Sequence, residues 1–277
     1  MTRFFDTYRR FYQTTGTPLE PNRFQQRWRV IIEENKGLFQ GARVLDIASH
    51  DGRWSFAALK AGAAYVEGVE ARAELVRRAL ANFTHYGIAR SQYNFVCQDA
   101  VKYLANARLA EFDVVLNLGF FYHTLKHLEI LENMARTKAK SFIIDTAVNM
   151  SNDAVITIVL EDVNSLLAAI DHLNSDTSTV PSGRISRLAL KWMLDYVGYD
   201  CAEMDWHRLV NDFVECEEYE KRMRSTFIAT RVRADVDRAQ PTTSFRMSRW
   251  WGLLRRADDR GRVCREGLRA ETRVDPG

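Results

Sequence analysis

The fold is decided by residues 44–56, which read VLDIASHDGRWSF. The strand-forming residues 44–47 contain an acid, Asp46, and lead into a short loop in which Gly52 is the only glycine. Helix-forming residues follow at once from Arg53. In open α/β sheets this order of strand, loop and helix leaves backbone amides and a positive helix end facing a ligand. The stretch therefore predicts a ligand site at the carboxyl end of the first strand.

Strand-like and helical stretches alternate on both sides of this motif, which indicates βαβ units and a parallel sheet covered by helices. Two further strands near the end of the pattern are adjacent in sequence, so we expect them to pair antiparallel at one edge. The predicted fold is α/β: a Rossmann-like, doubly wound, mostly parallel seven-stranded sheet. Strands are expected at 43–48, 63–70, 93–98, 112–119, 140–148, 199–207 and 224–232, and helices at 53–62, 71–87, 127–138 and 184–198.

The flanking segments have different patterns. Residues 1–40 have aromatic residues at helical spacing and predict an N-terminal helical cap on a domain spanning 41–233. Residues 149–182 interrupt the alternation with strand-like, helical and polar stretches, and we interpret them as an insertion after the fifth strand, either a lid or an oligomer contact. Residues 234–277 are rich in arginine and lack periodicity, which predicts a disordered tail.

Composition excludes several classes of protein. With 277 residues, 46% of them hydrophobic and 27% charged, the chain is typical of a globular protein. No apolar run approaches the roughly 20 residues of a membrane span, and the N-terminus lacks the apolar block of a signal peptide, so we expect a cytoplasmic protein with no membrane partner. The four cysteines form no CxxC pair and predict neither a zinc site nor a disulfide framework. The net charge of +3 is too small to indicate nucleic-acid binding by itself.

The loop chemistry narrows the choice of ligand. A dinucleotide site needs the G-x-G-x-x-G pattern, because the backbone must approach the pyrophosphate closely. Here the strand ends with an acid, Asp46, which would repel a pyrophosphate. A carboxylate at this point suits a cofactor with a cationic amino-acid end, either by accepting a hydrogen bond from its ammonium group or by ordering the loop.

The stretch from Arg43 to about Thr146 resembles the class I S-adenosylmethionine-dependent methyltransferases, whose first motif is an acid, any residue and then G-x-G-x-G. Asp46 matches the acid, Ala48 and His50 stand where the first two glycines usually are, and Gly52 matches the third. Because a side chain disfavours the left-handed backbone, His50 is expected either to keep a negative φ or to move the loop outward.

Three later positions extend the resemblance. Glu70 ends the second predicted strand, where the family places an acid on the ribose hydroxyls. Asp99 and Ala100 follow the third, where the family contacts adenine, and Asn117 ends the fourth beside the cofactor. Taken singly, such acids are often only helix caps or solvated turns, but their ordered spacing is specific. The resemblance implies S-adenosylmethionine as cofactor, with Asp46, Ala48, His50, Gly52, Glu70, Asp99, Ala100 and Asn117 in its site.

Residues 119–131, GFFYHTLKHLEIL, are expected to bind the acceptor of the methyl group. This stretch resembles the G-x-x-YH segment of enzymes that modify wobble uridine in tRNA and of several small-molecule O-methyltransferases. His123 is the candidate base for a hydroxyl acceptor, with Tyr122 and Asp145 as further catalytic candidates. The alternatives are that His123 merely begins a helix and that Asp145 is structural. His127 lies one helical turn after His123, but without a third ligand we expect no metal.

Three functions remain open. The favoured one is O-methylation of a small acceptor such as a sugar or polyol, because the chain shows no appended RNA-binding domain. The second is an RNA-modifying transferase, for which the arginines near the start and in the tail argue. The third is a non-catalytic module that binds S-adenosylmethionine and whose first motif has decayed at Ala48 and His50.

Overall fold

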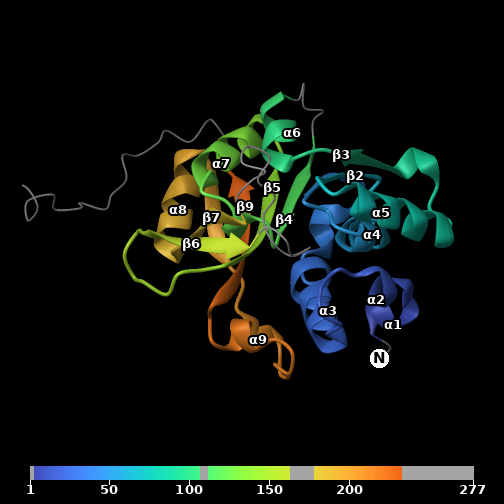
Figure 1. Cartoon of the computed structure of the whole chain (residues 1–277), viewed down its shortest axis with the longest axis horizontal. Helices are drawn as coiled ribbons and strands as arrows, with labels where there is room; N and C mark the ends of the chain where they lie inside the picture. Colours follow the sequence, from blue (N-terminus) through green and yellow to red (C-terminus); the bar gives the residue numbers. More distant parts are fainter. Residues whose placement is uncertain (1–2, 107–111, 163–177, 233–277) are drawn as a thin grey trace, which may run out of the picture. The chain divides into compact units, whose positions relative to one another are not determined.

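The computed structural model describes residues 3–106, 112–162 and 178–232. These residues form a seven-stranded sheet in the order β3-β2-β1-β4-β5-β9-β8 (Figure 1). The first five strands in this order run parallel. β9 is antiparallel to both β5 and β8, so the last two strands of the chain pair antiparallel as expected. The strands of the sheet are β1 (Arg43–Ile47), β2 (Tyr65–Glu70), β3 (Tyr93–Cys97), β4 (Val114–Leu118), β5 (Ser141–Ala147), β8 (Tyr199–Glu203) and β9 (Arg224–Arg231).

The predicted doubly wound fold is confirmed. β1 pairs with β4, so the strand order reverses at the centre of the sheet. Connections on either side of this point pass over opposite faces, which leaves a crevice at the carboxyl ends of β1 and β4 where such sheets bind their ligands.

Helices cover both faces of the sheet (Figure 1). The predicted helices are present, whereas α6, α9 and α10 were not predicted from the sequence. Short π-helical and 3-10 turns occur at Trp28–Glu33, Lys36–Phe39, Arg90–Gln92 and Phe121–His123. The helices are α1 (Phe4–Thr7), α2 (Arg10–Thr14), α3 (Pro21–Arg27), α4 (Arg53–Lys60), α5 (Ala73–His85), α6 (Ala100–Asn106), α7 (His127–Arg136), α8 (Arg187–Tyr196), α9 (Trp206–Leu209) and α10 (Glu217–Glu220).

The core has two layers because successive strand residues point to opposite faces. Leu45 and Val115 pack with buried residues of α6, α7 and α8 on one face. Val44 and Val114 pack on the other face, with α4 and the aromatic residues of the N-terminal helices. The N-terminal cap is therefore joined to the sheet by a continuous apolar layer.

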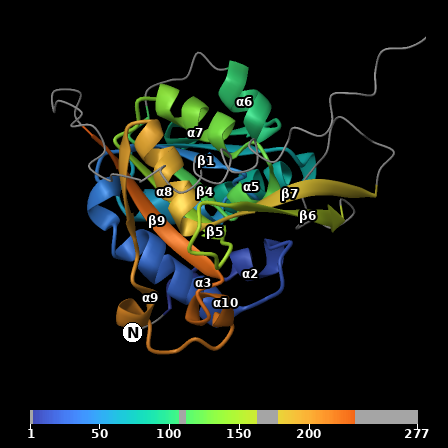
Figure 2. The same ribbon diagram turned by 90° about the vertical axis from the view of Figure 1, so that its left-hand side faces the viewer.

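The predicted insertion after β5 contains a two-stranded antiparallel ribbon, β6 (Ile156–Asp162) and β7 (Thr179–Ile185) (Figure 2). The strand-like stretch of the insertion is confirmed as β6. The polar stretch 174–183 was not expected to form a strand, yet its second half is part of β7. β7 tolerates Pro181 because a strand with a partner on only one side does not need every N–H. The predicted helix at 163–173 lies outside the described residues.

The arginine-rich stretch 234–277, predicted as a tail, lies outside the described residues as well. Among the helices of residues 3–106, 112–162 and 178–232, none is both long and apolar enough to cross a bilayer.

Candidate active site

A cavity of about 620 Å³ opens at the carboxyl ends of the parallel strands. Its wall is formed by the loop after β1, the ends of β2 and β4, helix α3 and ribbon strand β7. A cavity of this size is within the range that holds cofactors and drug-sized ligands. The predicted site residues that line it are Ala48, His50, Glu70, Asp99, Ala100, Tyr122 and His123. The other predicted residues, Asp46, Gly52, Asn117 and Asp145, are not among the residues that line it.

The loop after β1 keeps the backbone of a glycine-rich loop without the glycines. Ala48 has φ 55° and His50 has φ 54°, and Gly52 follows at 79°. Of the two alternatives predicted for His50, a negative φ is therefore wrong. Left-handed backbone at a residue with a side chain costs roughly 1–2 kcal/mol, and such strain persists only where the surroundings hold it.

Hydrogen bonds supply that support. The backbone N–H of Ser49 donates to the carbonyl of Val69 at 3.0 Å, and that of His50 donates to Glu70 Oε2 at 3.0 Å. Both contacts attach the loop to the end of β2. Gly52 is needed for packing rather than for ligand approach, because a Cβ there would lie 2.9 Å from Phe95 Cζ.

Asp46 orders the loop through a buried hydrogen bond to α4. Ser55 Oγ donates to Asp46 Oδ2 at 2.6 Å, and the Asp46 side chain is 1% exposed. Burial raises the pKa of Asp46 to about 7, a rise that the hydrogen bonds from Ser55 only partly offset. Of the two roles expected for this acid, the structure supports the one in which it orders the loop.

The N-terminal cap also holds this loop, through the hydrogen bond from Thr14 to Asp51. Asp51 is fully buried, accepts from Arg53 Nε at 2.7 Å and accepts from Thr14 Oγ1, next to α2, at 2.8 Å. Burial alone would raise the pKa of Asp51, but Arg53 and His50 hold it well below its usual range. Asp51 does not cap the following helix, because Gly52 occupies the N-cap position.

Glu70 is held where a ribose acceptor is expected. Its Oε1 accepts the backbone N–H of Arg72 at 2.9 Å, while Oε2 accepts that of His50. The side chain lines the cavity although the residue is only 6% exposed. Each carboxylate oxygen has two acceptor positions, so Glu70 retains capacity for hydroxyl donors.

Asp99 and Ala100 lie at the start of α6. Asp99 Oδ1 accepts the backbone N–H of Lys102 at 2.9 Å, which is the capping role considered from the sequence. Both residues also line the cavity, so the cap and a ligand contact are compatible.

Three buried polar groups at the β1 loop and the end of β4 have no hydrogen-bond partner within the described residues. They are both amide atoms of Asn117, Ser49 Oγ and His50 Nε2. Leaving such groups unpaired costs roughly 1–3 kcal/mol each. They lie at the ends of β1 and β4, the place of the predicted cofactor, and hydrogen bonds to a polar cofactor there would remove this cost. These unpaired groups include hydrogen-bond acceptors as well as donors. They therefore fit a neutral or zwitterionic group better than a pyrophosphate.

The acceptor side contains a pair that sequence analysis missed. His123 Nδ1 lies 2.5 Å from Oε2 of Glu161 in β6, and both side chains are 14% exposed. Burial raises the pKa of Glu161, but the hydrogen bond and charge of His123, with Ser182 and Arg184, lower it overall. An ionised Glu161 requires a proton on Nδ1, which leaves Nε2 as the basic nitrogen. Since 38 positions separate the partners, no local spacing revealed them.

Tyr122 also reaches the cavity. Its ring lies 4.0 Å from that of His123 between centroids, and the guanidinium of Arg184 lies 4.8 Å from its centre. His127, by contrast, is directed away from His123 and binds the carbonyl of Gly183 through Nε2 at 3.2 Å. The described residues contain no group of three metal-ligating side chains.

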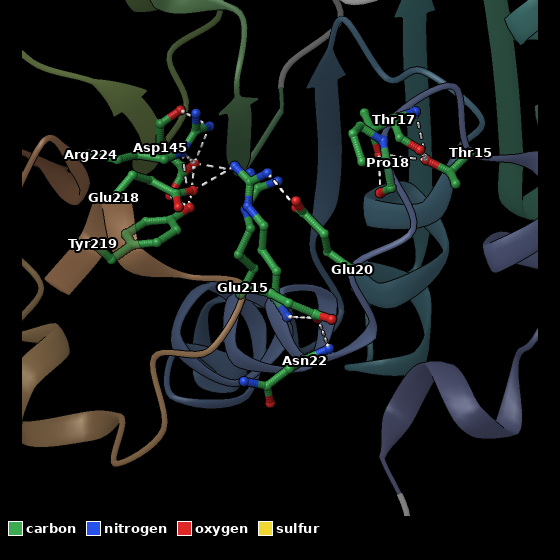
Figure 3. Close-up of polar contacts among 12 residues, drawn as sticks. Thr15, Thr17, Pro18, Glu20, Asn22, Asp145, Glu215, Glu218, Tyr219 and Arg224 are labelled. Carbon is green, nitrogen blue, oxygen red and sulfur yellow. Dashed lines mark hydrogen bonds and ion pairs between the residues drawn. The ribbon is translucent and has the colours of Figure 1, made fainter.

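Asp145 does not line the cavity, as a catalytic residue would. The sequence suggests a catalytic residue, whereas the structure buries it completely. It binds Arg27 and Arg224 and accepts hydrogen bonds from Tyr219 and Thr226. Figure 3 shows Asp145 beside Arg224 and Tyr219. Burial would raise its pKa, but the two guanidinium groups lower it to about 2. A carboxylate engaged on every side cannot collect a proton from an acceptor, so its role is to position the arginines.

Residues 44–140 match a protein family described as a methyltransferase domain. The match includes the β1 loop, Glu70, Asp99, Asn117 and His123. The chain therefore contains a methyltransferase domain of the S-adenosylmethionine-dependent kind. The cofactor of the class is S-adenosylmethionine, which agrees with the polar groups found unpaired beside the β1 loop of this methyltransferase.

Solved structures of methyltransferases have a similar fold. The N-terminal domain of EvdMO1, crystallised in the presence of S-adenosylhomocysteine (SAH) and D-fucose, has a TM-score of 0.52 and 18% identity over 73% of this chain and 81% of its own. Magnesium protoporphyrin IX methyltransferase from Synechocystis PCC 6803 has a TM-score of 0.52 and 15% identity over 82% and 91%. The DhpI–SAH complex has a TM-score of 0.53 and 14% identity over 82% and 94%. At these identities the likeness concerns the fold, and no curated protein matches the sequence.

Proposed function

We propose that this methyltransferase transfers the methyl group of S-adenosylmethionine to a hydroxyl oxygen of a small molecule, with His123 as general base. The observation that carries the proposal is the contact between His123, which lines the cavity, and Glu161 in β6. A base held by a carboxylate at hydrogen-bond distance is the arrangement that enzymes use to activate a weak oxygen nucleophile.

The bound cofactor would supply an activated methyl group on a positively charged sulfur. The protein then has to align the acceptor oxygen with that carbon and to remove its proton. The oxygen–carbon bond forms as the carbon–sulfur bond breaks, and the electron pair of that bond remains on sulfur. The hydroxyl proton passes to His123 Nε2, while Nδ1–H donates to Glu161 and stabilises the imidazolium.

We assign the cofactor to the predicted residues. Glu70 would accept the ribose hydroxyls, Asp99 and Ala100 would flank the adenine, and Asn117 would bind the amino-acid end with the backbone of Ala48 and His50. Asp46 and Gly52 would act through the shape of the loop. These assignments follow the burial and hydrogen-bond capacity described above.

We place the catalytic domain at residues 41–233, with 1–40 as a cap. The bonds from Thr14 to Asp51 and from Arg27 to Asp145 attach the cap to both halves of the cavity. The ribbon completes the wall, since Glu161 lies in β6 and Pro181 in β7 lines the cavity.

A direct test is methyl transfer from labelled S-adenosylmethionine to a panel of hydroxylated small molecules, including sugars and hydroxy acids, beside an RNA fraction. We expect label in one or more of the small molecules as a base-stable, hydrolysis-resistant ether. Label confined to RNA, or formation of a base-labile ester, would contradict hydroxyl methylation. Cofactor binding measured by calorimetry in parallel separates an inactive binding protein from an enzyme offered the wrong acceptor.

A further inference from the structure

Beneath the acceptor half of the cavity lies a buried cluster with more positive than negative charge. Arg27 Nη2 lies 2.9 Å from Asp145 Oδ1, and Arg224 Nη2 lies 2.5 Å from the same oxygen. The three residues are 9%, 6% and 0% exposed for Arg27, Arg224 and Asp145. Two guanidinium groups therefore share one carboxylate, which leaves one uncompensated positive charge (Figure 3).

The neighbouring groups do not remove this charge. Tyr219 donates its hydroxyl to Asp145 Oδ2 at 2.9 Å, and burial raises its pKa far above neutral, so it stays uncharged. Glu20 and Glu218 bind Arg23, at 2.9 and 2.6 Å, and their side chains are 30% and 29% exposed. The Oε1 atom of Glu218 is itself buried against Arg23, so these two carboxylates pair with Arg23 and not with Arg27 or Arg224.

Both arginines of the cluster face the cavity, whereas their carboxylate does not. The Nε of Arg27 is buried without a partner within the described residues. Arg224 approaches the end of β4 because Gly119 has no side chain there: a Cβ would lie 3.2 Å from Arg224 Nη2. Of the described carboxylates that line the cavity, Glu70 and Asp99 both lie in the cofactor half, so neither lies beside Arg27 or Arg224.

We infer that the acceptor carries a carboxylate or phosphate group, which binds between Arg27 and Arg224. Burying an unpaired charge is costly, and planar guanidinium groups match carboxylate and phosphate oxygens with paired hydrogen bonds. An anion at this point would neutralise the cluster and occupy the unpaired Nε of Arg27. This inference rests on the proposed methyl transfer, whose acceptor it restricts to hydroxylated anions.

The same chemistry has a second possible source, the amino-acid carboxylate of the cofactor. Arg27 lies 5.0 Å from the ring centre of Trp54 in α4, on the side of the β1 loop. Arg224 lies 5.4 Å from that of Tyr122, the neighbour of the proposed base. Arg224 thus lies on the side of His123, which favours the acceptor as the source of the anion.

The test uses inorganic phosphate and SAH as probes with the full chain at constant ionic strength. Calorimetry should show phosphate binding to the protein saturated with SAH. Arg27→Gln and Arg224→Gln should each raise the phosphate Kd by roughly 10- to 100-fold, as expected for lost charged hydrogen bonds. Arg29→Gln is the matched control. The Arg29 side chain is 44% exposed, and its Nε lies 3.9 Å from Glu34 Oε1, so it is an exposed arginine outside the cluster. This substitution should leave the phosphate Kd unchanged.

Each alternative outcome has a separate meaning. Phosphate binding that SAH abolishes would assign the arginines to the cofactor carboxylate and overturn the inference. No phosphate binding to either form, or binding unchanged in both cluster variants, would also overturn it. Two variants are used so that the test stands if one of them fails to fold, which circular dichroism reports. Failure of SAH to bind would instead refute the proposed function, while phosphate binding to the free protein would still report the anion site.

Discussion

The two halves of the cavity are built in different ways. The cofactor half is formed by the loop after β1 and the ends of β2, β3 and β4, all within residues 46–118. The acceptor half joins α3, the segment after β4, the ribbon and β9, so Arg27, His123, Glu161 and Arg224 come from four distant parts of the chain. The difference shows that one half is specified by local spacing and the other only by the folded topology.

The largest effect is expected when the proposed base, His123, is removed from the acceptor half. His123→Ala should lower turnover by roughly 10²–10⁴-fold, because the acceptor hydroxyl loses its proton acceptor. SAH affinity should stay within about twofold of wild type, since His123 belongs to the acceptor half. Turnover, measured with the best acceptor of the panel, is the readout. A variant with normal turnover would leave alignment alone to explain the chemistry.

Glu161→Gln tests whether the ribbon contributes to that base. The substitution keeps the shape but removes the charge opposite His123 Nδ1, so we expect turnover to fall roughly 10- to 100-fold. The acid limb of the pH–rate profile should also move, because the imidazolium loses a charged partner. Glu132→Gln, on an exposed position of α7, is the control, and an equal loss there would remove the assignment.

Glu70→Ala should act on the other half. Loss of a charged acceptor for the ribose hydroxyls should raise the SAH Kd roughly 10- to 100-fold, equivalent to about 1.5–3 kcal/mol. The rate at saturating cofactor should change much less. Calorimetry gives the first quantity, and unchanged affinity would take Glu70 out of the cofactor site.

Asp46 gives the cofactor half a distinctive pH dependence. Its pKa is about 7 in the folded protein against 3.8 as the ordinary value, so the folded state binds more protons than the unfolded state between these values. The free energy of unfolding should therefore fall as pH rises from about 4 to 7. Asp46→Asn should flatten this fall, measured by urea unfolding at several pH values. Exposed Asp153→Asn should not, and a slope that survives in Asp46→Asn would contradict the account.

The smallest expected effect concerns the strained loop. Ala48→Gly relieves a left-handed alanine but adds freedom to the unfolded chain, for a net gain of about 0.5–1 kcal/mol in the free energy of unfolding. Ala58→Gly, in the middle of α4, should instead destabilise by about 1 kcal/mol. Equal losses in both variants would show that the φ of Ala48 is not strained.

These contrasts explain how far the sequence predicts the molecule. The sheet and its main helices follow from alternating strand and helix patterns, and Glu70 and Asp99 follow from their place after strands. The left-handed Ala48 and His50 were not predicted, because residue preference disfavours that backbone and it is maintained by bonds to β2, a segment distant in sequence. Glu161 and Arg224 were missed because their partners are distant in sequence, and Asp145 was assigned wrongly because a strand-end acid looks the same whether it faces the cavity or arginines behind it.

The separation of the two halves is tested most directly by measuring SAH affinity and turnover together in His123→Ala and Glu70→Ala. We predict a crossed result: His123→Ala loses turnover and keeps SAH affinity, whereas Glu70→Ala loses affinity and, with saturating cofactor, keeps most of its turnover. If His123→Ala instead weakens SAH binding as much as Glu70→Ala, or leaves turnover intact, the acceptor half does not contain the base and the central claim is contradicted.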